Sequence, residues 1–210
     1  MAMREARPFL VFLGILTFIT AFFYWWAAIL PALLFAYVLY FFRDPERTPP
    51  DDPLAVVSAA DGRVILVDEV LEDAFTHRRM KRVAVFLSVF DVHVNRTPFN
   101  GTFIKQHHHA GEFLDARDPA VDVKNEAMNW LLKTERGEVV IRQIAGLIAR
   151  RIVAWACEGQ TMKTGERFGM IRFGSRTDVF LPPDCDILVQ PGDRVEGGKS
   201  VIARWKTASN

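Results

Sequence analysis

The most constraining feature of this sequence is a run at residues 8–42 that contains no charged residue. A single straight helix through it would be about 52 Å long at 1.5 Å per residue, well beyond a hydrocarbon core of about 30 Å. The aromatic residues 24–26 lie in the middle of the run and favour the headgroup level. We therefore expect a turn there, between apolar helical arms at 8–23 and 27–42 that form a membrane-anchoring hairpin. A shallow insertion that does not cross the bilayer is the alternative.

Arginines flank both ends of this run, with Arg4 and Arg7 before it and Arg43 and Arg47 after it. By the positive-inside rule both ends face the cytoplasm. We therefore expect an anchor in the inner cell membrane, with the rest of the chain on the cytoplasmic side. A cleaved signal peptide is the competing interpretation, but the run is too long for one.

Beyond the anchor, assigned to residues 1–43, the sequence changes character. A proline-rich polar linker occupies residues 44–53, and residues 54–210 are long enough for one compact domain. Turn residues separate β-branched or alternating segments, which predict strands at 62–70, 82–89, 101–107, 138–144 and 149–156. The segment 125–137 fits either a short helix or a strand. The domain is therefore expected to be mainly β.

One segment suggests a more specific architecture. Residues 189–205 contain short strand-like flanks joined through PGDRVEGG, and they resemble the strand-turn-strand of biotinyl and lipoyl carrier domains. We therefore expect a barrel-sandwich-hybrid-like β domain behind the hydrophobic helical hairpin. A carrier also needs an exposed lysine in a symmetric hairpin tip, and the candidate, Lys163 in TMKTG, lacks that context. The fold analogy therefore stands without the carrier function.

Composition argues against several classes of partner. With 26 basic and 25 acidic residues the net charge is +1, which gives no electrostatic reason to expect a nucleic-acid partner. Cys157 and Cys185 lie far apart without metal-ligand spacing, and we expect both to be buried apolar residues. Adjacent residues of a strand point to opposite sides, so the three histidines at 107–109 cannot all ligate one ion. No metal site is expected.

The pair Gly174 and Ser175 interrupts two apolar strand-like runs, FGMIRF and DVFLP. One interpretation is a turn or a bulge. The other is a peptide bond that is cut by its own serine, because the hydroxyl can attack the preceding carbonyl and convert the amide into an ester. A glycine before the serine admits the close approach that such an attack needs. Both interpretations stay open from these residues alone.

Two further polar positions carry candidate chemistry. Asp61 lies in SAADGRV, where an ordinary Asp-Gly turn before a strand is the simpler interpretation. His93 lies in SVFDVHVNRTP, a predicted strand whose alternation places Asp91, His93 and Asn95 on one face. These three side chains either line a cleft or meet solvent.

In their order, behind an anchor, these segments resemble the phosphatidylserine decarboxylase proenzymes of the short, archaeal or alphaproteobacterial-like type. The resemblance covers nearly the whole chain and rests on YFFRDPERTPP, ADGRV, LSVFDVHVNRTPFNGT, KNEAMNWLL, RQIAGLIARRI and RFGSRTDVFLP. It implies self-cleavage between Gly174 and Ser175, which leaves a heterodimer of two chains and converts Ser175 into a pyruvoyl cofactor. That group forms a Schiff base with phosphatidylserine, so that CO2 and phosphatidylethanolamine are released. Further dimerisation is left open.

The resemblance also implies roles for individual residues. Asp61 matches the aspartate of the family's ADG motif, and His93 matches the first histidine of its DxHxxH-like segment. Longer relatives place a second histidine where this chain has Arg96. Either His93 takes over the base role here, or this short branch processes differently; we expect His93 to act as the base of self-cleavage and to share a hydrogen bond with Asp61. Asn95 or Arg96 is expected to contact the phosphate or the carboxylate of the substrate.

Two other classes of function fit parts of the sequence. A non-enzymatic membrane adaptor with a lipoyl- or biotinyl-like domain would explain the anchor and the PGDRVEGG turn. A pyruvoyl decarboxylase that acts on a soluble amino acid would explain the Gly-Ser pair, but it would leave the anchor without a purpose.

Overall fold

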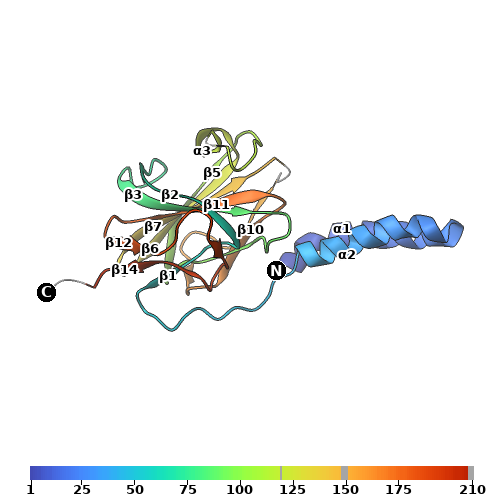
Figure 1. Cartoon of the computed structure of the whole chain (residues 1–210), viewed down its shortest axis with the longest axis horizontal. Helices are drawn as coiled ribbons and strands as arrows, with labels where there is room; N and C mark the ends of the chain where they lie inside the picture. Colours follow the sequence, from blue (N-terminus) through green and yellow to red (C-terminus); the bar gives the residue numbers. More distant parts are fainter. Residues whose placement is uncertain (119, 148–150, 208–210) are drawn as a thin grey trace. The chain divides into compact units, whose positions relative to one another are not determined.

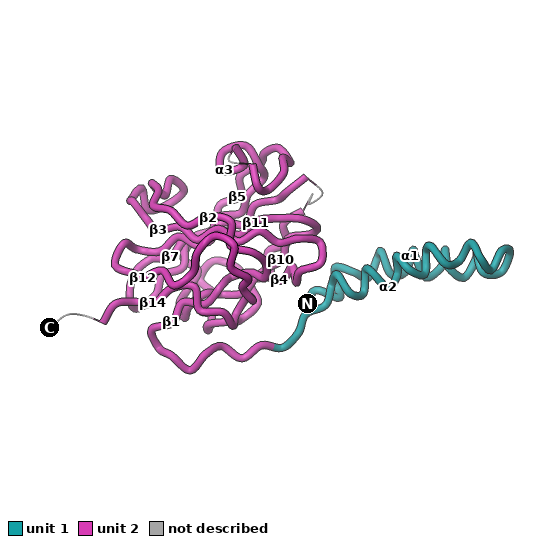
Figure 2. The backbone as a smooth tube through the Cα atoms, in the orientation of Figure 1, with its two compact units in different colours: residues 1–46 teal, residues 47–210 magenta. Residues whose placement is uncertain are grey.

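The computed structural model describes residues 1–118, 120–147 and 151–207. The chain divides into two compact units, residues 1–46 and residues 47–210 (Figure 2). The division falls inside the proline-rich segment 44–53. The domain limits drawn from the sequence stay predictions.

The first unit consists of two helices joined by a short turn. Its elements are α1 (Ala2–Phe23), the 3-10 helix η1 (Trp25–Ala28) and α2 (Ile29–Phe41). The rings of Phe9 and Phe42 stack with 6.2 Å between their centroids, so the second helix returns along the first. The predicted hairpin is confirmed, and its turn lies at the predicted aromatic residues because the extended backbone of Tyr24 ends α1.

The first unit presents apolar surface. By length and composition α1 is long and apolar enough to cross a membrane, and the apolar stretch that follows it is shorter. Large apolar side chains are exposed on this unit, among them Phe18, Phe22 and Trp25. A surface of this kind is better matched to lipid than to water. The unit therefore suggests membrane association.

The second unit is built around an eight-stranded antiparallel sheet in the order β13-β2-β3-β11-β7-β6-β5-β9 (Figure 1). Its strands are β2 (Gly62–Leu71), β3 (Arg79–Leu87), β5 (Gly101–His109), β6 (Ala127–Thr134), β7 (Gly137–Ala145), β9 (Thr161–Met162), β11 (Ser175–Leu181) and β13 (Arg194–Val195). Two three-stranded sheets complete the unit. One contains β1 (Ala55–Val57), β14 (Val201–Trp205) and β12 (Cys185–Ile187), and the other contains β4 (Val94–Arg96), β10 (Arg167–Ile171) and β8 (Ile152–Ala154). One short helix, α3 (Val121–Lys124), precedes β6.

The mainly β fold behind a hydrophobic helical hairpin is therefore confirmed. Four predicted strands occur with small shifts at their ends, as β2, β3, β5 and β7. The strand predicted at 149–156 is shorter, with β8 at Ile152–Ala154; Ala149 and Arg150 lie outside the described residues. The segment 125–137 adopts the strand alternative as β6, because it pairs with β5 on one side and β7 on the other.

The segment 189–205 does not form one simple hairpin. Its C-terminal strand, β14, pairs with β12 just before the segment, and the amide of Leu188 donates to the carbonyl of Ile202 at 2.9 Å. The intervening β13 joins β2 at the edge of the large sheet instead. The loop thus connects two sheets.

The largest apolar cluster fills the space between the sheets. Its centre is a group of three aromatic rings from different strands, Phe103, Trp130 and Phe168. Their centroids lie 5.0 to 5.6 Å apart in tilted or edge-on arrangements, which aromatic pairs prefer. This packing fixes the positions of β5, β6 and β10.

The strand β11 is buried on both faces along its whole length. On one face Val179 and Leu181 join the large apolar cluster, whereas on the other Phe180 packs with Met80 in a separate cluster. Alternation places Ser175 and the residues two and four positions after it on the first of these faces. A strand enclosed in this way has little freedom to shift its register.

The two cysteines differ in exposure. Cys185 is buried as expected, but Cys157 is exposed, so the prediction that both are buried is wrong. Cys157 follows β8 in a loop, where the sequence offers no periodicity from which burial can be judged. Burial raises the pKa of the Cys185 thiol to about 12.

This difference predicts selective alkylation. Iodoacetamide at pH 8 should modify Cys157 in the native protein, while Cys185 reacts at least about a thousandfold more slowly, because a thiol reacts as the thiolate and needs access. Peptide mass spectrometry measures the two rates. A Cys157→Ser variant should take up no label until urea is added. Similar rates at both cysteines in the native protein would contradict the burial of Cys185.

Candidate active site

The Gly174–Ser175 junction lies at the end of the turn between β10 and β11. Phe173 and Gly174 both have positive φ angles, 60° and 44°. The left-handed region is costly for a residue with a side chain, and such conformations occur most often at functional sites. A Cβ on Gly174 would have no atom within 4 Å, so the backbone conformation and not the space requires glycine there. The junction is therefore held in a strained turn.

Ser175 is the first residue of β11 and is fully buried. It pairs with Leu87 of β3 on one side and with Ala145 of β7 on the other. Its Oγ has no hydrogen-bond partner among the described residues. A buried hydroxyl without a partner costs about 1–3 kcal/mol, which proteins seldom retain without a use for the group.

The carbonyl of Gly174 is enclosed by the loop that follows β7. A Cβ on Gly146 would overlap the Gly174 carbonyl oxygen, and it would also press on Ala116. The backbone of Gly146 can approach this carbonyl because glycine has no side chain. Two glycines thus shape the junction, Gly174 through its φ angle and Gly146 through its size.

His93 lies immediately before β4 and is buried. Its carbonyl accepts a hydrogen bond from the amide of Ile171, the last residue of β10, at 3.2 Å. Its Nδ1 lies 3.0 Å from the carbonyl oxygen of Asp91. Because a carbonyl only accepts, Nδ1 carries the proton and Nε2 is the basic nitrogen. The ring is therefore oriented by its own loop, close in the fold to the turn that precedes Ser175.

The strand predicted around Asp91, His93 and Asn95 is shorter than expected: it begins at Val94, so strand alternation does not relate Asp91 and His93 to Asn95. All three residues are buried, so the alternative that they meet solvent is wrong. The carboxylate of Asp91 accepts from the amide and hydroxyl of Ser88, at 2.9 and 2.6 Å, and from Arg194 at 2.6 Å. Asp91 thus connects its loop to Ser88, just after β3, and to Arg194 of β13.

Asn95 belongs to a buried chain of hydrogen bonds that runs across the sheets. The indole of Trp130 donates to Gln143 at 2.9 Å, Gln143 donates to Asn95 at 2.7 Å, and Asn95 donates to the hydroxyl of Thr177 at 3.1 Å. Thr177 is on the same face of β11 as Ser175. We did not anticipate Gln143 and Thr177 from the sequence; a signal for each was a polar residue inside an otherwise apolar strand.

Asp61 lies near the start of β2, with its carboxylate bound by two groups. Arg47 donates to one oxygen at 2.7 Å, and the amide of Gly197 donates to the other at 2.8 Å. Burial raises the pKa of Asp61, while the charge of Arg47 opposes that rise. The predicted hydrogen bond between Asp61 and His93 is not among these contacts. Asp61 instead joins the start of the domain to the loop that follows β13.

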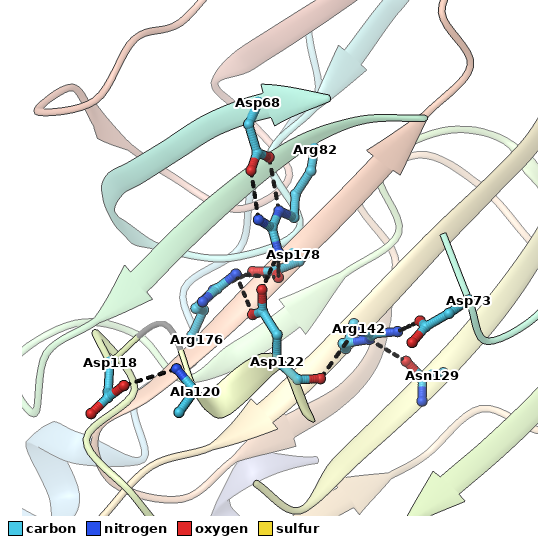
Figure 3. Close-up of polar contacts among 10 residues, drawn as sticks. All are labelled: Asp68, Asp73, Arg82, Asp118, Ala120, Asp122, Asn129, Arg142, Arg176 and Asp178. Carbon is cyan, nitrogen blue, oxygen red and sulfur yellow. Dashed lines mark hydrogen bonds and ion pairs between the residues drawn. The ribbon is translucent and has the colours of Figure 1, made fainter. Parts of the chain in front are cut away.

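A cluster of charged residues lies on the face of β11 that is opposite to Ser175 (Figure 3). Arg176 donates to both oxygens of Asp178 at 2.7 Å and lies 2.9 Å from Asp122 of α3. Arg82 of β3 contacts the same Asp122 at 2.6 Å and makes a two-pronged pair with Asp68. Burial raises the pKa of Asp178, and the charge of Arg176 opposes that rise. The cluster ties α3, β2, β3 and β11 together directly behind the Gly-Ser junction.

A cavity of about 270 Å³ opens beside the junction. Its lining comes from the end of β3, from the segment before α3 and from the loop after β7. The lining residues are Phe86, Ser88, Val89, Asp115, Ala116, Arg117, Leu147 and Gly174. Gly174 is thus both a cavity wall and one side of the bond before Ser175.

Other predicted positions lie away from this cavity. Arg96 is buried and donates to the carbonyl of Gly165 at 3.0 Å, and Asn95 is enclosed in the chain of hydrogen bonds described above. The histidines at 107–109 are exposed, and His108 lies 3.1 Å from Glu126. Among the residues that the structure describes, no group of three His, Cys, Asp or Glu side chains could hold a metal ion.

Comparisons with known proteins fit this arrangement. The family model described as phosphatidylserine decarboxylase matches residues 34–203. A phosphatidylserine decarboxylase proenzyme from Symbiobacterium thermophilum is 46% identical over 202 residues, covering 96% of this chain and 94% of that protein. The proenzyme from Pelobacter propionicus is 44% identical, with 95% and 94% covered, and that from Syntrophus aciditrophicus is 43% identical, with 96% of each chain covered.

All three relatives are proenzymes, which are precursors that mature by processing. The chain belongs to the phosphatidylserine decarboxylase family, whose members process themselves and act as lyases. The resemblance stated from the sequence is thereby confirmed. The alternative of a non-enzymatic membrane adaptor is not favoured.

The position of Gly146 generates a test. Gly146→Ala should slow chain splitting about a hundredfold, because the added methyl group displaces the Gly174 carbonyl by a fraction of an ångström to about 1 Å. The split fraction is followed with time on denaturing gels after cell-free synthesis. Gly192→Ala is the control, since Gly192 has φ 104° and no atom near its would-be Cβ. That variant should be strained but should split normally. Normal splitting of a Gly146→Ala protein in which Cys185 stays protected would contradict the geometry.

Proposed function

We propose that this chain is a membrane-anchored phosphatidylserine decarboxylase that matures by cutting its own backbone between Gly174 and Ser175. The observation that carries the proposal is the buried Ser175 hydroxyl, which has no hydrogen-bond partner among the described residues and follows two residues with positive φ. The strained turn brings the scissile bond out of regular strand geometry, and a hydroxyl with no competing partner is available for attack.

The first step is an acyl shift. The Oγ of Ser175 bonds to the carbonyl carbon of Gly174, the bond from that carbon to the Ser175 nitrogen breaks, and the hydroxyl proton ends on the nitrogen. Loss of the Ser175 α proton then expels the Gly174 carboxylate and leaves dehydroalanine. Its imine tautomer takes up one water and releases ammonia, which leaves a pyruvoyl group at the new N-terminus.

His93 is the proposed base for this sequence. Its protonated Nδ1 faces the Asp91 carbonyl, so the basic Nε2 is the nitrogen that accepts a proton. The backbone of His93 is bonded to Ile171 at the start of the turn that leads to Ser175. Asp61 is proposed to support processing through its contacts with Arg47 and Gly197, which hold the neighbouring loops.

The residues at the junction suit a pyruvoyl group at position 175. Such a group supplies a ketone that captures a primary amine and withdraws electrons from the bond to a departing carboxylate. The chain's contribution is positional: β3 and β7 hold residue 175 from both sides, and its pairing partners Leu87 and Ala145 are buried apolar residues. Phosphatidylserine, the substrate named for the family, carries both the amine and the carboxylate that this chemistry needs.

The anchor is proposed to hold this domain at the cytoplasmic face of the inner cell membrane. Arg4, Arg7 and Arg43 flank the apolar hairpin, and this distribution supports cytoplasmic ends. Anchoring replaces a search through solution by a search along the lipid surface. The two products of cleavage are proposed to stay together as a heterodimer, because β11 remains paired with both β3 and β7.

Ser175→Ala tests the cleavage site directly. The variant should remain one full-length polypeptide without decarboxylase activity, because the methyl group offers no nucleophile. Wild-type protein should give two masses under denaturing conditions, the smaller beginning at residue 175 with no free amine. A wild-type chain that stays whole while it consumes phosphatidylserine would overturn the proposal.

His93→Gln tests the proposed base. The glutamine amide keeps polar contacts but cannot take up a proton at neutral pH, so splitting should slow by about 10²- to 10⁴-fold. The matched control is His108→Gln at an exposed histidine, which should split at the wild-type rate. Protection of Cys185 shows that each variant is folded. An unchanged rate in His93→Gln would remove His93 from the processing step.

A further inference from the structure

The cavity beside Gly174 has a specific relation to the proposed cofactor, so this inference rests on the proposed function. In the conversion above, the ketone oxygen takes the place of the Ser175 nitrogen. The bond that is cut joined this nitrogen to Gly174, so a ketone at position 175 would lie next to Gly174. Gly174 is part of the cavity wall. A substrate amine that condensed with this ketone would take the place of its oxygen, so the substrate would extend into this cavity.

The cavity suits a headgroup better than a whole lipid. Its volume of about 270 Å³ is below the roughly 300–1,000 Å³ typical of pockets for drug-sized ligands. The headgroup of phosphatidylserine presents an ammonium, a carboxylate and a phosphodiester, while its acyl chains stay in the bilayer. Leu147, in the lining, is an exposed apolar side chain that suits the less polar part of such a ligand.

Arg117 is the basic side chain among the described lining residues of this cavity. Its Nε and Nη2 donate to the two oxygens of Asp115 at 3.0 and 2.6 Å, and its guanidinium carbon lies 5.4 Å from the centre of the Phe86 ring. A guanidinium presents the same two donors to a phosphate as to a carboxylate. Asp115 therefore occupies the donors that an anionic ligand would use.

The pair of Arg117 and Asp115 can open at little cost. The two side chains are 65% and 47% exposed, and ion pairs exposed to this degree add little to stability. By contrast, Arg96 and Asn95, the positions suggested from the sequence for this contact, are buried with partners inside the domain. Arg117 can therefore exchange the carboxylate of Asp115 for an anionic group of a ligand in this cavity.

We propose that Arg117 binds the phosphodiester of the phosphatidylserine headgroup and thereby places the substrate amine at position 175. Asp115 competes with the phosphate for the guanidinium and holds Arg117 over Phe86 while the cavity is empty of substrate. Arg117 is in this view a substrate-binding residue that favours a phosphorylated serine ester over free serine.

The experiment compares full-length Arg117→Gln, Arg117→Lys and Asp115→Asn in mixed micelles of phosphatidylserine and neutral detergent. Arg117→Gln should split normally but raise KM about 10- to 100-fold, the value of a lost charge-assisted hydrogen bond. Arg117→Lys should lie between it and wild type because it keeps the charge without the two-pronged geometry. Asp115→Asn should lower KM, because the competing carboxylate is gone.

A second measurement separates binding from structure. Wild-type enzyme should prefer glycerophosphoserine to O-methylserine, which keeps the amine and the carboxylate but lacks a phosphate, and Arg117→Gln should lose that preference. Arg136→Gln is the matched control, since Arg136 is an exposed arginine in the turn between β6 and β7, at the opposite end of β7 from Ala145. It should leave KM and the preference unchanged.

The kinetic results that would overturn the proposal are an unchanged KM and preference in Arg117→Gln, an equal rise of KM in Arg136→Gln, or changes in the same direction in Arg117→Gln and Asp115→Asn. A failure of Arg117→Gln to split would also overturn it, since Arg117 would then act in processing. A wild-type chain that neither splits nor decarboxylates would instead contradict the proposed function.

Discussion

The enclosure of β11 is the constraint on which the rest of the structure depends. The strand pairs along its length with β3 on one side and β7 on the other, and both of its faces are buried. Ser175 is its first residue, so its backbone is fixed by the sheet while the residues just before it turn sharply. Rigid support on one side of a bond and strain on the other is an arrangement that favours a reaction at that bond.

The buried charges behind β11 give this enclosure its specificity. Apolar packing alone would tolerate neighbouring arrangements of similar volume, whereas Arg176 and Asp178 must each meet an opposite charge. The two pair with each other, and further partners come from α3 and β3, which are distant from β11 in sequence. We infer that the cluster sets the register of the strand, because a shift by one residue would place both charges in the apolar cluster on the other face.

Much of the fold could be predicted from the sequence, but the site only in part. The charge-free run predicted the hairpin, and alternation predicted β2, β3, β5 and β7, because both signals are local. The Gly-Ser pair was visible for the same reason. The contacts of Asp61 with Arg47 and Gly197, and those of Asn95 with Gln143, depend on which strands become neighbours, which no local pattern records. The expected hydrogen bond between Asp61 and His93 failed because a shared motif does not specify distances.

The order of strands would give the proposed break before Ser175 a lasting consequence. The segment from Ser175 onward supplies β11 to the large sheet and β14 to a smaller one, each between or beside strands from the earlier part of the chain. Before the break, these pairings form within one molecule. Afterwards, two separated pieces would have to meet by diffusion, at a rate that depends on their concentration, and the piece with the ketone could not regain its serine. Under the proposed cleavage, assembly of this protein is a one-way event: an unfolded mature copy would have lost the covalent connection that guided its folding, and the cell would have to replace it by synthesis.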